Sequence, residues 1–171
     1  MSESRLTADL IRRLAPDFEI LREIRGVHPI DGEGVRIDLM ARGRSHLVER
    51  GFTNQWFGIE CKWADRIGGT TSKTTRMVWQ SITYAQSRFG VNGTPVRPAF
   101  VAVYTPEDLH SLIERHLKHL LALGLYGNVG RLYFYRDGTW GIRFANIYAR
   151  ASQSGLYVNR SQLPKPRVGS V

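Results

Sequence analysis

The sequence of 171 residues has one cysteine, few lysines and no long apolar run. Because Cys61 stands alone, an internal disulfide is excluded, and without an apolar N-terminal segment we expect a reducing, cytoplasmic setting. No uninterrupted apolar stretch reaches about 18 residues, so no membrane span is expected. Internal repeats and low-complexity tracts are also lacking, and the length fits one globular domain.

The charge that is present is strongly positive. Lysine and arginine number 24 against 15 acidic residues, which gives a formal net charge of +9 and a pI near 10.2. The lysines are Lys62, Lys73, Lys118 and Lys165. Arginine therefore carries most of the charge, and its planar guanidinium suits phosphate oxygens. This composition favours DNA or another nucleic acid as partner, the alternative being a merely basic or ribosome-associated protein.

Apolar periodicity and turn residues predict alternating helices and strands. The expected elements are a helix over 4–14, strands over 18–24, 35–40 and 56–63, a helix from the glycine turn 68–72 to about 89, a loop over 90–98, a strand over 99–104, a helix from Thr105-Pro106 to Gly124, and a hairpin over 132–144. This order predicts an α/β fold with a mixed central sheet flanked by helices. We expect one domain over 1–152 and a polar tail over 153–171.

Two of the expected strands carry acids among apolar neighbours. Side chains alternate along a strand, so Glu60 and Lys62 point to one face of theirs, and Asp38 is bracketed in the same way by Ile37 and Leu39. Burying such carboxylates is costly unless something compensates their charge. Mg²⁺ (or Mn²⁺) would compensate both, because it binds hard oxygen ligands together with waters and a substrate phosphate. Lys62 would then stabilise charge on the phosphate or orient the attacking water.

These residues resemble the signature of the PD-(D/E)XK nuclease superfamily, in which an acid ends one strand and an acid-x-lysine triplet lies on the next. The signature reads Arg36-Ile37-Asp38-Leu39 and Gly58-Ile59-Glu60-Cys61-Lys62 in this chain. The segment Gln80-Ser81-Ile82-Thr83-Tyr84 is similar to the Gln-x-x-x-Tyr element of the phage-exonuclease and RecB-like branch. The resemblance covers residues 5–104, about three fifths of the chain.

The resemblance implies a restriction-endonuclease-like core, here with an added C-terminal hairpin, and a Mg²⁺-dependent nuclease. It also implies metal ligation by Asp38, Glu60 and the carbonyl of Cys61. Lys62 would be the catalytic lysine, and Gln80 would lie near the metal site.

The chain departs from this pattern at several positions. Ile37 stands where the signature often has proline. Members resembling Holliday-junction resolvases offer a further acid from their first helix, and Glu3, Asp9 and Glu23 are all candidates here. Toroidal exonucleases and dimeric resolvases both occur among similar proteins, so a homo-oligomer such as a dimer is one expectation.

Several residues are candidates for nucleic-acid binding. The helix after the proposed metal site offers Lys73, Arg76 and Tyr84, and its N-terminus suits a phosphate or, alternatively, is a plain solvent-exposed cap. Arg42 and Arg44 lie in the connection after the second strand. Phosphate contacts of this kind bind DNA with little sequence preference.

The sequence therefore predicts a metal-dependent deoxyribonuclease. One alternative is a DNA-binding module on a degenerate nuclease scaffold, and another is a ribonuclease that uses the same centre. The residues are equally compatible with an endonuclease or an exonuclease, and with roles in phage recombination, DNA repair or host defence.

Overall fold

The computed structural model describes residues 2–63, 71–106, 109, 111–124, 128–144, 147–152 and 155–158. Its helices are α1 (Glu3–Leu14), α2 (Ser45–Glu49), α3 (Thr71–Gln86) and α4 (Ser111–Gly124). Its strands are β1 (Phe18–Val27), β2 (Gly34–Gly43), β3 (Phe57–Cys61), β4 (Arg88–Val91), β5 (Thr94–Val96), β6 (Val101–Tyr104), β7 (Val129–Phe134), β8 (Trp140–Phe144), β9 (Ile147–Ser152) and β10 (Gly155–Val158). None of the helices in these ranges is both long and apolar enough to cross a membrane.

The strands form one sheet in the order β10-β9-β8-β7-β6-β3-β2-β1-β4-β5. β6 is parallel to both of its neighbours, β3 and β7, whereas the other pairs are antiparallel. All four residues of β6 are buried, as expected for a strand covered on both faces. The predicted α/β class and the mixed sheet flanked by helices are confirmed.

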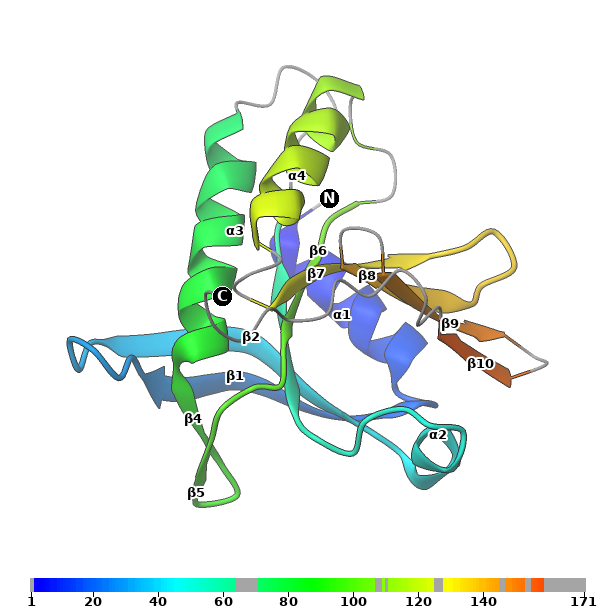
Figure 1. Ribbon diagram of the computed structural model, residues 1–171, viewed down its shortest axis with the longest axis horizontal. Coiled ribbons are helices and arrows are strands. Elements are labelled where there is room, and N and C mark those ends of the chain that lie inside the picture. Colours follow the sequence, from blue (N-terminus) through cyan, green and yellow to red (C-terminus); the bar gives the residue numbers. More distant parts are fainter. Residues whose placement is uncertain are drawn as a thin grey trace, which may run out of the picture.

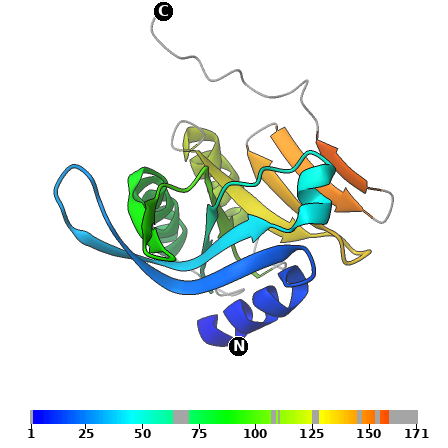
Figure 2. The ribbon, with the colours of Figure 1, turned by 90° about the horizontal axis from the view of Figure 1, so that it is seen from below.

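Helices cover both faces of this sheet. α3 and α4 pack side by side on one face (Figure 1), and α1 lies on the other, as the view from below shows (Figure 2). One core cluster joins α1 to the sheet, and two others lie beneath α3 and α4. β2 and β3, which carry the candidate catalytic residues, therefore lie between the two helical layers.

The amphipathic helix predicted for residues 4–14 is present as α1. The Ser2 hydroxyl caps it by accepting a hydrogen bond from the Arg5 N–H at 3.4 Å. The side chains buried against the sheet are Leu6, Leu10 and Leu14. This cap places Glu3 in the first turn of the helix.

Residues 88–96 form a hairpin in place of the expected end of a helix and loop. α3 is shorter than predicted, and β4 pairs with β5 across a turn at Asn92 and Gly93. These residues have φ values of 49° and 79°, and Asn-Gly is the favoured pair for a two-residue hairpin turn. The sequence prediction is wrong here because Phe89 continues the helical spacing of Ala85, which hid the turn signal.

α4 begins later than predicted. Its first residue is Ser111, and neither Thr105 nor Pro106 is helical. The Thr105 hydroxyl, expected to cap the helix, accepts a hydrogen bond from Arg131 Nη2 at 3.3 Å instead. Residues 107, 108 and 110, which include the acids of the expected first turn, lie outside the described residues.

The sheet extends further toward the C-terminus than predicted. The expected hairpin is present as β7 and β8, whose connection includes Gly138 with φ 81°. β9 then pairs with β8 and β10 with β9, so residues 155–158 of the expected polar tail form an edge strand. The tail prediction therefore needs correction for this short apolar segment, which pairs with β9 in antiparallel fashion.

Gly58 in β3 lies in one of the tightest contacts of the core. A Cβ atom there would lie 2.3 Å from Ile37 Cδ1 and 3.1 Å from Val101 Cγ2, and both of those side chains are fully buried. Gly58→Ala is expected to lower the free energy of unfolding by about 1–3 kcal/mol through overpacking, measured by urea unfolding. Gly34→Ala in β2 is the control, because no atom lies near its Cβ position. Equal stability of the two variants would contradict this account.

Candidate active site

Asp38 on β2 and Glu60 on β3 lie opposite one another. Leu39 pairs with Ile59 in the antiparallel register, so the next residue outward on each strand is one of the two acids. Asp38 Oδ2 accepts a hydrogen bond from the Cys61 N–H at 2.8 Å, and Glu60 is only 4% exposed. The two predicted metal ligands are therefore brought together in a largely buried position.

The regular alternation of β2 is interrupted at Asp38. Ile37 packs into the cluster beneath α3, whereas Leu39 packs into the cluster around α1, so the expectation that they share one face is wrong. The pairing with β1 is interrupted at the same place, where Glu23 stands across from Asp38 with a left-handed φ of 49°. Asp38 thereby directs its carboxylate to the β3 backbone.

Burial and mutual repulsion disfavour ionisation of both carboxyl groups. Burial, followed by the charge of Asp38, raises the pKa of Glu60 from 4.5 to about 8. Burial also raises the pKa of Asp38, and the hydrogen bond from Cys61 opposes this shift. Lys62 lowers the pKa of both acids, but it does not offset their burial. The pair therefore needs further positive charge before both acids ionise near neutral pH.

Cys61 contributes its backbone and not its thiol. The Cys61 side chain is fully buried in the core cluster that joins α1 to the sheet. The neighbouring Glu60 points to the other face of β3, beneath α3. Burial raises the pKa of the thiol, which keeps it protonated. Its N–H holds Asp38, and only its carbonyl oxygen is a candidate ligand.

Lys62 and Glu3 meet beyond the end of β3. The Lys62 N–H continues the strand pairing by donating to the Tyr104 carbonyl at 2.9 Å. Its Nζ lies 3.4 Å from Glu3 Oε1, and Glu3 Oε2 accepts a hydrogen bond from the Trp63 N–H at 3.4 Å. Glu3 therefore ties the first turn of α1 to the strand end that carries the catalytic candidate.

Of the three candidates for a further acid, Glu3, Asp9 and Glu23, only Glu3 reaches the site. Asp9 instead pairs with Arg12 at 2.5 Å on the surface of α1. Glu23 is exposed, and its carboxylate lies 3.8 Å from Arg36. The capping residue Ser2 was the signal available in the sequence, because it places Glu3 at the start of the helix.

A pocket of about 390 Å³ opens at this end of β3. The residues that line it are Glu3, Lys62, Trp63, Lys73, Arg76 and Gln80. The first half of α3 therefore meets Lys62, as the sequence analysis predicts. Three cationic side chains face the same hollow, which suits an anionic ligand such as a phosphate.

Two buried oxygen atoms at the site lack a hydrogen-bond partner among the described residues. They are Glu60 Oε2 and Gln80 Oε1. Buried polar atoms are normally paired, so these two suggest a ligand that prefers oxygen donors. In the described ranges, no group of three His, Cys, Asp or Glu side chains could hold a metal ion. Two carboxylates with neutral oxygens nonetheless fit Mg²⁺, which usually keeps several waters and a substrate phosphate.

Comparison with known proteins assigns the chain to no family. No family model, curated protein or solved structure matches it.

Tyr84 is not on the surface expected for a DNA contact. Tyr84 is only 8% exposed, and its ring packs edge-on against the Phe89 ring at a centroid distance of 6.0 Å. Tyr84 lies on the same helical face as Met77, seven residues earlier, which is fully buried. Burial, and next the charge of Glu60, raises the pKa of Tyr84 to about 12. The residue supports the site from the core.

Arg42 and Arg44 lie away from the pocket. Because β2 and β3 are antiparallel, residues after Asp38 run toward the start of β3, and the pocket lies at its other end. Arg42 forms an ion pair with Glu19 at 2.6 Å, and Arg44 Nε donates to a backbone carbonyl at 3.0 Å. Their predicted role in nucleic-acid binding gains no support from this arrangement. Both contribute contacts around α2 and the β1–β2 pair.

Proposed function

We propose that this protein is a metal-dependent nuclease that hydrolyses phosphodiester bonds of DNA. The observation that carries the proposal is the buried Glu60 Oε2, which stands opposite Asp38 without a hydrogen-bond partner in the described part of the chain. A divalent cation would neutralise this pair, and the neighbouring pocket offers Lys62, Lys73 and Arg76 to a phosphate.

Asp38, Glu60 and the carbonyl of Cys61 are the groups that would hold Mg²⁺ or Mn²⁺. All three are hard oxygen donors, and the Cys61 N–H already orients Asp38. Such an ion supplies Lewis-acid polarisation of the phosphodiester and activation of a water molecule. Gln80 adds a buried amide oxygen on the pocket side of α3.

Lys62 would act on the phosphate itself. Its ammonium group faces the pocket and is partly shielded from water, so it can stabilise the charge that develops on the phosphate oxygens. Glu3 acts as a positioning residue, because its two oxygens contact both Lys62 and the Trp63 backbone. This contact holds the ammonium group of Lys62 at the mouth of the site.

Lys73 and Arg76 would bind phosphates of the DNA backbone next to the reacting one. Both lie in the first half of α3, a helix without a single acidic residue. Contacts of this type are independent of base sequence, and the net charge of +9 strengthens them. The order α1, β1 to β3, α3 and β6 supports a restriction-endonuclease-like core, the fold that the resemblance implies. The same proposal includes a reducing, cytoplasmic setting, in which the buried Cys61 stays a thiol.

The test is digestion of labelled linear, circular, branched and single-stranded DNA with Mg²⁺, in parallel with EDTA and with RNA of the same sequence. Cleavage of DNA that requires the metal is the expected result. DNA binding without metal-dependent breakage would replace the proposal with a binding module, and cleavage of RNA alone would make the protein a ribonuclease. The positions of the cuts distinguish an endonuclease from an exonuclease.

A further inference from the structure

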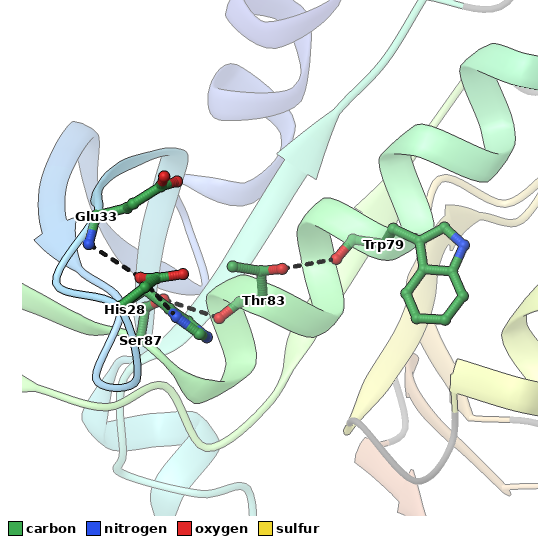
Figure 3. Close-up of polar contacts among 6 residues, drawn as sticks. His28, Glu33, Trp79, Thr83 and Ser87 are labelled. Atoms are coloured by element: carbon green, nitrogen blue, oxygen red, sulfur yellow. Dashed lines mark hydrogen bonds and ion pairs between the residues drawn. The ribbon is translucent and has the colours of Figure 1, made fainter.

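Trp79 is an exposed aromatic residue on the helix that lines the pocket. Its exposed fraction is 62%, whereas Trp56 and Trp140 are 8% and 2% exposed. In Figure 3 the indole ring of Trp79 stands clear of the α3 ribbon. Tryptophan is usually well buried, and exposed aromatic rings are enriched where proteins bind partners.

The position of Trp79 relates it to the phosphate-binding residues. It follows Arg76 by one helical turn and directly precedes Gln80, both of which line the pocket. Three residues along a helix correspond to a rise of about 4.5 Å and a rotation of about 300°, so Trp79 lies one turn along α3 from Arg76 and about 60° around the helix axis from it. Trp79 itself is not among the residues that line the pocket, so its indole is a neighbour of the pocket residue Arg76 and not part of the lining.

The residues near Trp79 on α3 are mostly polar or cationic, and none of them is acidic. α3 holds Lys73 and Arg76 and no acid. Thr83, one turn after Trp79, donates its hydroxyl to the Trp79 carbonyl at 3.1 Å, as Figure 3 shows. A single planar ring among cationic and polar groups is suited to a ligand that joins a flat base to a phosphate.

We propose that Trp79 stacks on an unpaired base of the substrate, next to the phosphate that Arg76 contacts. The inference rests on the proposed nuclease function and narrows its substrate to nucleic acid with a single-stranded segment at the site. In a duplex the face of each base is covered by its neighbours, so only an unpaired or terminal base offers its face to the indole.

The experiment compares Trp79→Ala, Trp79→Phe and Leu112→Ala with the wild-type protein. Leu112→Ala is the matched control, because Leu112 is 58% exposed on the neighbouring helix α4. Binding of oligo-dT of about 12 nucleotides, of oligo-U and of a blunt duplex is measured in EDTA, so that cleavage does not interfere. The oligo-dT and oligo-U arms distinguish DNA from RNA as the source of the base.

Trp79→Ala is expected to weaken oligo-dT binding about fivefold or more, with less than about a twofold effect on the duplex. Trp79→Phe should restore most of the affinity, and Leu112→Ala should behave like wild type. Equal losses on both DNAs, or none, would overturn the inference. So would a change in sedimentation of Trp79→Ala, since it would reveal a protein interface.

These outcomes are separate from those of the nuclease proposal. Metal-dependent cleavage with unchanged oligo-dT binding by Trp79→Ala overturns the stacking alone. Loss of oligo-dT binding in a protein that cleaves nothing leaves the stacking in place and removes the nuclease.

Discussion

Lys62→Ala is expected to remove metal-dependent DNA cleavage while leaving DNA binding largely intact. The positive charge of Lys62 lowers the pKa of both acids, and its side chain lines the same pocket as Arg76 and Lys73. Its removal takes away charge stabilisation at the reacting phosphate, a loss of about a hundredfold or more in cleavage rate. Binding depends instead on many dispersed arginines, so one lysine contributes little to it.

Two comparisons make the Lys62 prediction specific. Lys118→Ala is the matched control, because Lys118 is an exposed lysine on α4 that pairs with Glu114 at 3.7 Å. It should cleave DNA like the wild-type protein. DNA affinity measured in EDTA should differ little among the three proteins. Full nicking activity of Lys62→Ala would refute the assignment of Lys62, and loss of DNA binding would mean that the residue serves affinity and not chemistry.

The pairing of Asp38 with Glu60 at the centre of the site could be predicted from the sequence. Apolar neighbours on both sides of Asp38 and Glu60 predict two buried strands, and a charge kept in such a strand indicates a function. The two strands follow one another along the chain, and consecutive strands are usually neighbours in a sheet. The pocket face of α3 followed from the same reasoning, because Lys73, Arg76 and Gln80 come directly after the lysine-bearing strand.

Contacts that depend on packing between distant elements were not predictable in this way. Glu3 reaches Lys62 only because buried leucines fix α1 against the sheet, and nothing in the sequence spacing states that distance. The position of Arg42 depends on the direction of β2 relative to β3, because antiparallel pairing places Arg42 at the end of the strands away from the pocket. Tyr84 was a different case, because the polar Gln80 and Ser81 before it indicated an exposed face, whereas Ser81 and Tyr84 are both buried.

Glu60→Gln is expected to abolish cleavage and to remove a pH dependence of stability. Losing one of the two proposed carboxylate ligands should reduce the cleavage rate by about a thousandfold or more. In EDTA, the wild-type protein keeps a proton on Glu60 between the ordinary pKa of 4.5 and about 8, whereas the unfolded chain has released it. Since the folded state binds more protons in this window, the free energy of unfolding falls as the pH rises through it.

Over the full window the free energy of unfolding should fall by on the order of 5 kcal/mol, because each pKa unit corresponds to about 1.4 kcal/mol and the pKa of Glu60 rises from 4.5 to about 8. Asp38 adds to it in the same direction, since its pKa is also raised. Glu60→Gln has no proton to lose, so its stability should change far less between pH 5 and pH 8, as urea unfolding at each pH would show. Glu49→Gln, at an exposed position in α2, is the matched control and should follow the wild type.

Addition of Mg²⁺ should reverse the wild-type trend. The ion competes with the proton for Glu60, so the rise in melting temperature on adding Mg²⁺ should be larger at pH 8 than at pH 6. Glu60→Gln should show a small rise at both pH values, because one ligand is lost and the site no longer titrates. A wild-type melting temperature that does not respond to Mg²⁺ at pH 8 would mean that the buried acids hold a proton and not a metal. In that case the cleavage mechanism proposed for this site fails together with its metal.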